Sequence, residues 1–253
     1  MDTLLRLHLS QMIAIIYLLL FKEIYQVRIR KLKATNELVY HLNVWIVGQA
    51  YQLAQFHFHW GSSGQPGSEH TYKGKQYDGE IHFVHYNIEC GDSLTQAIAN
   101  CKGPEAVAVL GVWIEAGGRD NHDFKSIIDG LQTITSKGDM VEIKPMDMTK
   151  LMPYNLNKFY RYDGSLTTPA CNEIVTWTVF KEYVKISKRQ LEEFFKLTTT
   201  DGVAAPSTAP IPLINNFRPT QPLNGRPVYY ADLQLRPHHD DWEIAPYCGI
   251  YYK

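Results

Sequence analysis

The sequence predicts a mainly β fold arranged as one domain. After about Gly48, short runs rich in Val, Ile, Phe, Tyr and Trp alternate with Gly, Pro, Asn and Asp, which is typical of strands joined by turns. Long stretches with helical periodicity are scarce. With 253 residues, 45% of them hydrophobic, the chain is large enough to bury one full core.

The individual elements follow from the same residue preferences. Runs of β-branched and aromatic residues predict strands at Tyr51–Trp60, Glu80–Tyr86, Ala106–Ile114, Ile174–Phe180 and Tyr183–Ile186. Shorter segments predict helices at Ser93–Asn100, Phe124–Thr133 and Lys188–Lys196. The last of these helices follows Ser187, whose hydroxyl can accept a hydrogen bond from a backbone N–H of the first turn. Thr198–Pro212 is rich in Thr, Ala and Pro and predicts a surface loop within the domain.

The first 47 residues form an atypical segment. Residues 7–21 carry no formal charge, and several Lys and Arg residues follow them. An apolar helix needs roughly 20 residues to cross a bilayer, and the basic side of such a run tends to stay cytoplasmic. The run could therefore be a signal or membrane anchor, or a buried terminal helix. Membrane association of the chain is left open for the same reason. Residues 48–230 are the predicted domain, and 231–253 a C-terminal tail.

Charge and cysteine content narrow the function classes. Twenty-five Lys and Arg residues against 26 Asp and Glu residues give a net charge of −1, which argues against nucleic acid as a partner. The four cysteines, Cys90, Cys101, Cys171 and Cys248, show no C-x-x-C spacing. Disulfides are possible, and four cysteines allow three complete pairings.

Three histidines predict a metal site. In the strand Gln55–Gly61, alternation places His57 and His59 on one face and aromatic residues on the other. If the strand containing His82 is a neighbour, three imidazoles converge and leave one coordination position open, as in catalytic Zn²⁺ sites. Gln55 and Glu80 each precede a histidine by two residues on the same face, where they can accept its remaining N–H.

The other histidines fit the metal pattern less well. We interpret His70, His85 and His122 as packing or hydrogen-bonding residues, because none has a same-face partner. His238–Asp241 contains two histidines and two aspartates, but it lies in the polar tail and is interpreted as solvated.

Seven segments resemble the α-class carbonic anhydrases. They occur in the family's order and cover about residues 48–230: Gln55–Gly61, Gly67–Thr71, Glu80–Asn87, Ala108–Gly111, Tyr162–Pro169, Val175–Trp177 and Asn216–Asn224. The resemblance implies a large, mainly antiparallel twisted central sheet with a few short helices. It also implies a monomeric enzyme that hydrates carbon dioxide reversibly to bicarbonate and a proton.

The resemblance assigns roles residue by residue. His57, His59 and His82 correspond to the Zn²⁺ ligands, Thr167 to the hydroxyl that orients the attacking hydroxide, and Glu69 to the acceptor of the Thr167 proton. Thr168 borders the position of substrate and bicarbonate. The apolar wall that receives carbon dioxide corresponds to Val84, Val109, Leu166 and Trp177. Supporting polar residues correspond to Gln55, Glu80, Tyr162, Arg218 and Asn216.

The N-terminal part departs from this resemblance. Family members carry about 80 further residues before the first histidine strand, including a Ser-Gln-Ser-Pro-Ile-type segment and a proton-shuttling histidine, and we find no match to these in residues 1–47. We therefore expect impaired proton shuttling, with His41 as a substitute candidate. A non-catalytic binding module of the same fold is the alternative function, although such modules tend to lose a zinc histidine.

Cys171 bears on localisation. Secreted and membrane-bound family members often have half of a disulfide at this position, which hints at a secreted or membrane-associated ancestry. Without a convincing signal peptide, a cytoplasmic location is also possible. A free buried thiol at Cys171 is the alternative to a disulfide.

Overall fold

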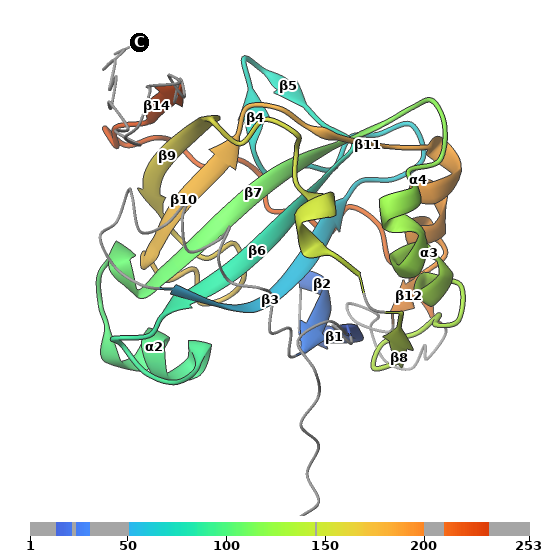
Figure 1. Cartoon of the computed structure of the whole chain (residues 1–253), viewed down its shortest axis with the longest axis horizontal. Coiled ribbons are helices and arrows are strands. Elements are labelled where there is room, and N and C mark those ends of the chain that lie inside the picture. The colour runs from blue at the N-terminus through green and yellow to red at the C-terminus, as the bar shows by residue number, and fades with distance from the viewer. Residues whose placement is uncertain (1–13, 22–23, 31–50, 145, 200–209, 233–253) are drawn as a thin grey trace, which may run out of the picture.

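A large twisted sheet organises the computed structural model, which describes residues 14–21, 24–30, 51–144, 146–199 and 210–232 (Figure 1). In spatial order the sheet contains β14 (Tyr229–Asp232), β9 (Lys158–Gly164), β10 (Val175–Phe180), β7 (Val107–Ala116), β6 (Gly79–Asn87) and β3 (Tyr51–Trp60). A seventh strand, β11 (Val184–Ile186), pairs with the end of β7. β10 and β11 run parallel to β7, and the other neighbours are antiparallel. The predicted mainly β fold with a mainly antiparallel sheet is therefore confirmed.

The helices are short and lie close to the predicted segments. They are α2 (Leu94–Asn100), α3 (Lys125–Leu131), α4 (Lys188–Phe195) and the 3₁₀ turns η1 (Pro104–Ala106), η2 (His122–Phe124) and η3 (Met148–Leu151). Ser187 caps α4 as expected, and Gln190 returns the hydrogen bond to the Ser187 backbone N–H, which completes a capping box. Ser93 caps α2 by accepting from the N–H of Gln96.

Two small pairings lie outside the central sheet. β4 (Thr71–Tyr72) pairs with β5 (Lys75–Gln76), and β12 (Thr198–Thr199) pairs with β13 (Ile211–Pro212). The second pairing corrects the prediction of a loop over Thr198–Pro212, because both ends of that segment form a ladder; residues 200–209 lie outside the described residues.

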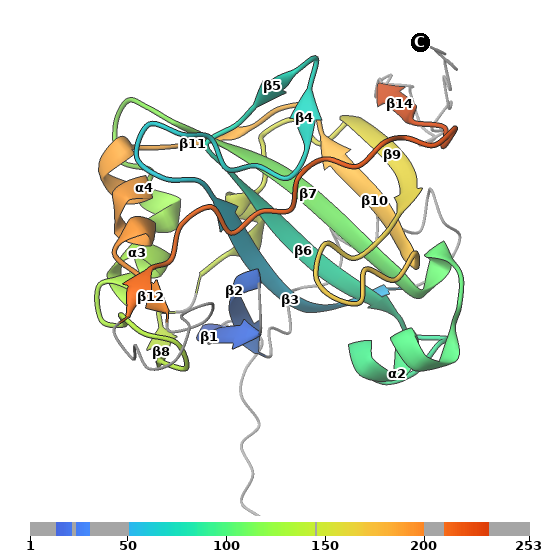
Figure 2. The same ribbon diagram turned by 180° about the vertical axis from the view of Figure 1, so that it is seen from behind.

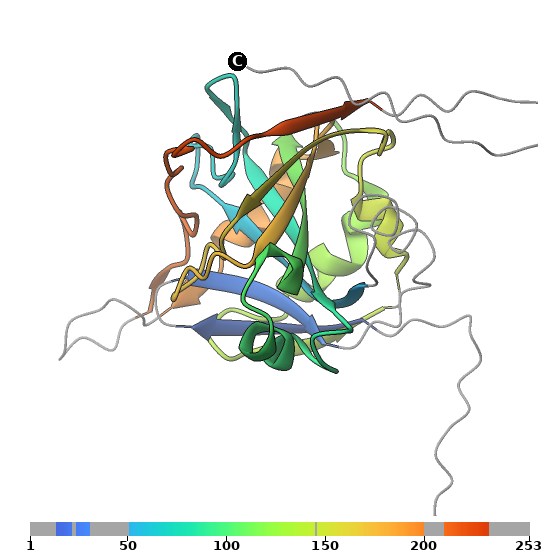
Figure 3. The ribbon, with the colours of Figure 1, turned by 90° about the vertical axis from the view of Figure 1, so that its left-hand side faces the viewer.

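The prediction of a buried terminal helix in the apolar N-terminal run is wrong for the residues that the structure describes. Ala14–Phe21 is a strand, β1, rather than a terminal helix, and it pairs with β2 (Ile24–Arg30) and β8 (Met140–Ile143). β2 lies beside the edge strand β3 (Figure 3). Among the described residues, no helix combines the length and apolarity needed to cross a membrane.

The core lies on both faces of the sheet and fixes the orientation of β3. Phe56, Phe58 and Trp60 are buried on one face, where residues of α3 and α4 pack against them (Figure 1). Alternation along the strand then directs His57 and His59 to the opposite face. Burial of the aromatic side chains thus determines where the polar site forms.

Candidate metal centre

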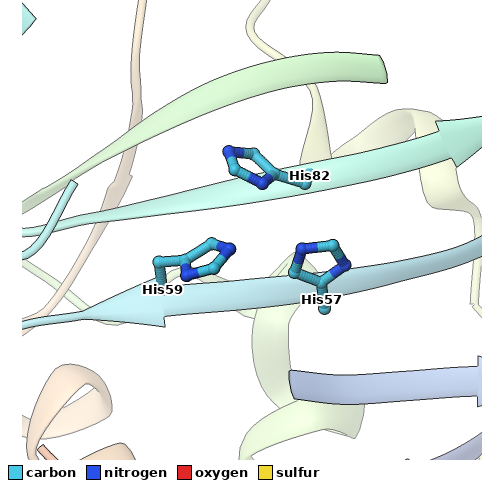
Figure 4. A group of neighbouring side chains, drawn as sticks. All are labelled: His57, His59 and His82. Atoms are coloured by element: carbon cyan, nitrogen blue, oxygen red, sulfur yellow. The ribbon is translucent and has the colours of Figure 1, made fainter. Parts of the chain in front are cut away.

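Three histidines from two adjacent strands converge on the polar face of the sheet (Figure 4). His57 lies directly opposite His82 in the antiparallel register of β3 and β6, and His59 lies one pleat further along β3. Their ring centroids are 4.6–5.1 Å apart, and one ligand nitrogen from each lies within 4.8 Å of the others. All three side chains are at most 3% exposed. The arrangement is the three-nitrogen set that the strand pattern predicted.

A separate acceptor orients each imidazole. The Gln55 side-chain oxygen lies 2.9 Å from His57 Nδ1, the Asn216 carbonyl oxygen 2.8 Å from His59 Nδ1, and Glu80 Oε1 2.9 Å from His82 Nε2. Because these oxygens can only accept, each of these ring nitrogens carries a proton. His57 and His59 are then left with Nε2, and His82 with Nδ1, as the nitrogens able to bind a metal.

Zn²⁺ fits this donor set. Two buried polar atoms, His59 Nε2 and Glu69 Oε2, have no hydrogen-bond partner within the described part of the chain, although they lie 3.4 Å apart. Burial lowers the pKa of His59, with the nearby Glu69 opposing that effect, so the imidazole is held in the neutral form that a metal requires. Three neutral imidazoles with one further position is a catalytic zinc arrangement.

Glu69 and Thr167 lie on a common cavity beside the histidines. The cavity has a volume of about 1140 Å³. Glu69 is 6% exposed, and its Oε1 accepts a 2.6 Å hydrogen bond from the backbone N–H of Arg218. The Arg218 guanidinium donates to the Ser165 hydroxyl at 3.3 Å. Thr168 follows in the same turn, where its carbonyl accepts from the N–H of Cys171, but its side chain does not line the cavity.

The four predicted apolar residues form part of one cluster. Val84 pairs with Val109 across β6 and β7, and Val109 pairs with Trp177 across β7 and β10. Leu166 packs against the same cluster. The Trp177 ring lies 4.7 Å from the His82 ring, so this apolar surface borders the metal position.

Asn216 connects a distant segment to β3. Besides the carbonyl contact to His59, its side-chain oxygen accepts from the Trp60 N–H at 2.6 Å, and its amide donates to the Phe58 carbonyl at 3.3 Å. The partner of His59 thus lies 157 residues further along the chain.

His70 belongs more closely to the site than the sequence suggested. Its Nδ1 lies 2.6 Å from Glu80 Oε1, and its Nε2 lies 2.6 Å from the Tyr162 hydroxyl. Burial alone would lower the pKa of His70, but the charge and hydrogen bond of Glu80 raise it above its usual value. His70, Glu80 and His82 also form a second potential ligand group, which shares His82 with the group of three histidines. In the sequence, the one feature that associates His70 with the site is its position directly after Glu69.

The remaining histidines and cysteines are also placed. His85 is buried on the opposite face of β6, and His122 opens η2 and is exposed. Cys90 and Cys101 form a disulfide, which selects among the pairings left open, and Cys171 is free and partly exposed. His41, His238–Asp241 and Cys248 lie outside the described residues.

His85 gives a prediction about acid stability. Burial lowers the pKa of its imidazole from 6.5 to about 4, partly offset by a hydrogen bond to the Ala108 carbonyl. Between these pH values the unfolded chain takes up a proton that the folded chain excludes, so the free energy of unfolding falls as the pH falls. The total loss from this group is about 3 kcal/mol. Its contribution is constant above the unfolded pKa.

We therefore expect His85→Gln to flatten the pH dependence of the free energy of unfolding between pH 6.5 and 4, as measured by urea denaturation. The matched control is His122→Gln, since His122 is exposed and should leave the dependence unchanged. Equal slopes for wild type and His85→Gln would contradict the prediction.

Comparison with known proteins places the chain in a family. A model of the eukaryotic-type carbonic anhydrase family matches residues 25–232, starting earlier than the motif comparison at about Gly48. Carbonic anhydrase 1 of Mus musculus is 37% identical over 183 residues, which cover 72% of this chain and 66% of the relative. Carbonic anhydrase 3 of Sus scrofa is 37% identical over 179 residues, with 71% and 65% covered. The chain thus spans slightly less than two thirds of these relatives.

Proposed function

The chain belongs to the eukaryotic-type carbonic anhydrase family, and from that premise we propose that it catalyses the zinc-dependent, reversible hydration of carbon dioxide to bicarbonate and a proton. The observation that carries the proposal is the buried group of His57, His59 and His82, in which an acceptor orients each ring. When bound, Zn²⁺ lowers the pKa of a coordinated water to about 7 and so makes hydroxide available at neutral pH.

Glu69 and Thr167 would orient the nucleophile. Because Glu69 Oε1 is already occupied by the Arg218 N–H, Oε2 is the oxygen left to accept the Thr167 proton. Once Thr167 donates to Glu69, its hydroxyl oxygen can only accept a hydrogen bond from the attacking hydroxide. The hydroxide lone pair is then directed at the substrate carbon.

The apolar cluster would receive carbon dioxide. Val84 and Val109 are at most 4% exposed, and Trp177 lies against His82. These side chains offer no ligand atom that competes for zinc, and they suit a small apolar substrate. Thr168 would border the bicarbonate position, with Tyr162 and Arg218 supporting the surrounding hydrogen bonds.

Proton export is the step that we expect to limit turnover. A group of pKa about 7 that loses its proton directly to water does so at roughly 10³ s⁻¹, if recapture proceeds at about 10¹⁰ M⁻¹s⁻¹. Imidazole buffer should therefore raise kcat severalfold by carrying the proton away, with little change in kcat/KM. Stopped-flow hydration at increasing buffer concentration measures this. A kcat independent of buffer, which becomes dependent on it in His41→Ala, would show an internal shuttle instead.

The function as a whole is tested by measuring zinc content and carbon dioxide hydration on the same preparation of the full chain. One zinc per chain with hydration above the buffer background supports the enzyme. One zinc per chain without hydration would instead support the non-catalytic binding module.

We also propose an oxidising compartment for the protein. The Cys90–Cys101 disulfide supports this, because such bonds persist in secreted and extracellular proteins and are rare in the cytosol.

A further inference from the structure

The central sheet ends at β14, and among the described residues no strand pairs with the outer side of β14. On its inner side β14 pairs with β9, and Figure 2 shows it at the rim of the sheet. In an antiparallel pair, alternate residues point their N–H and C=O groups away from the neighbouring strand. The outer side of β14 therefore offers backbone donors and acceptors to a further extended strand.

One face of this edge carries tyrosine rings and a lysine. Tyr230 lies opposite Tyr160 in the register of β14 and β9, and their ring centroids are 5.1 Å apart. Residues opposite each other in an antiparallel pair share a face of the sheet. Lys181 Nζ lies 5.2 Å from the centroid of the Tyr230 ring and donates to the Tyr230 hydroxyl at 3.3 Å. We call this side of β14 the lysine face.

The lysine face has an unbalanced positive charge. Asp232, the acidic residue of β14, pairs with Lys158 at 3.6 Å, whereas Lys181 forms no ion pair within the described residues. Arg226, which precedes β14, directs its guanidinium at backbone carbonyls rather than at a carboxylate. This face therefore attracts a carboxylate and repels an ammonium group.

The opposite face of β14 is apolar and aromatic. Tyr229 and Ala231 alternate with Tyr230 and Asp232, so they point to this side. Tyr229 is 49% exposed, and Ala231 lies opposite Phe159 and packs against the core. Successive side chains of an added strand would also point to alternate faces. A strand that alternates acidic and apolar residues thus complements both faces of β14.

We propose that an extended segment of a partner protein, with alternating acidic and apolar residues, adds to β14 as a further strand. Its backbone pairs with the outer side of β14, its carboxylates face Lys181, and its apolar side chains contact Tyr229. Tyrosine suits such a surface because it supplies a large contact area at a low cost in conformational entropy. The free backbone edge favours a peptide over an acidic oligosaccharide, which has no strand to pair. The inference is independent of the proposed catalytic activity.

Fluorescence anisotropy with a labelled peptide of four Glu-Val repeats and the full chain tests the proposal. We expect saturable binding with a dissociation constant below about 1 mM, which weakens as salt is added. A peptide of four Lys-Val repeats is the charge-reversed control and should not bind. Failure of the Glu-Val peptide to saturate, equal binding of the two peptides, or tighter binding of an oligogalacturonate would overturn the proposal.

N-methylation of the Glu-Val peptide tests the backbone pairing. A paired strand directs every second N–H at its neighbour, so methylation of either all Glu or all Val nitrogens should abolish binding. Methylation of the other set should spare it, and that peptide is the matched control. Equal effects of the two modifications would contradict pairing with β14.

Variants of the chain test the two faces of β14. Lys181→Glu and Tyr229→Ser should each weaken binding of the Glu-Val peptide about fivefold. The matched controls are Lys188→Glu on α4 and Tyr154→Ser, which replace exposed residues outside β14 and its partner strand and should leave the affinity unchanged. Equal affinities of the variants and their controls would overturn the proposal. Sedimentation of the free chain as a dimer that Lys181→Glu dissociates would assign this edge to a second copy of the chain instead.

Discussion

His82→Ala is expected to abolish tight zinc binding and carbon dioxide hydration together. His82 faces His57 across the strand pair, and no other residue of the described ladder can supply its nitrogen from that position. Loss of a supporting partner alone costs 10- to 100-fold in metal affinity, so loss of a ligand should cost more than about 100-fold. Metal analysis after dialysis against a weak chelator, together with stopped-flow hydration, measures both effects.

The matched control for this variant is His122→Ala, because His122 is exposed at the start of η2 and touches none of the three ligands in the structure as described. It should retain one zinc per chain and full activity. If His82→Ala also retained one zinc per chain, the ligand assignment would be wrong.

Thr167→Ala is expected to separate activity from metal binding. Thr167 lines the cavity with Glu69 but is not among the metal-binding nitrogens, so zinc content should not change. Removal of a preorganised polar contact to the reacting group should lower kcat/KM by about 100-fold or more. Hydration kinetics at matched zinc content measure the loss.

Thr167→Ser serves as the conservative variant. Because Ser keeps the hydroxyl that donates to Glu69, most of the activity should return, whereas a purely packing role of the Thr methyl group would leave the two variants equally impaired. Wild-type rates in Thr167→Ala would exclude an orienting role.

The local part of the metal site could be predicted from the sequence because strand alternation is a strict constraint. Phe56 and Phe58 must enter the core, so His57 and His59 must point the other way. The same parity relates Gln55 to His57 and Glu80 to His82, and those contacts are 2.9 Å in both cases. The acceptor for His59 could not be predicted in this way, since it is a backbone carbonyl far along the chain.

The strands that were not predicted show a different limit. β9 contains Phe159, Tyr160 and Tyr162, but Lys158, Arg161 and Asp163 interrupt them, so it lacks the continuous apolar run of the strands that were predicted. β9 forms a strand because it pairs with β10 on one side and with β14 on the other, and its sequence does not predict these pairings. The apolar run at 7–21 was ambiguous for the opposite reason, because a short uninterrupted apolar stretch fits either a helix or a buried strand.

The hydrogen bonds between Asn216 and β3 have a consequence for biosynthesis. Ribosomes add about 5–20 residues per second, so the 157 residues between His59 and its acceptor take roughly 10–30 s to emerge. During that interval His59 Nδ1 lacks the Asn216 carbonyl to which it donates its proton. The backbone N–H of Trp60 likewise lacks its acceptor, the side-chain oxygen of Asn216. The full set of oriented imidazoles therefore forms only after Asn216 has emerged from the ribosome.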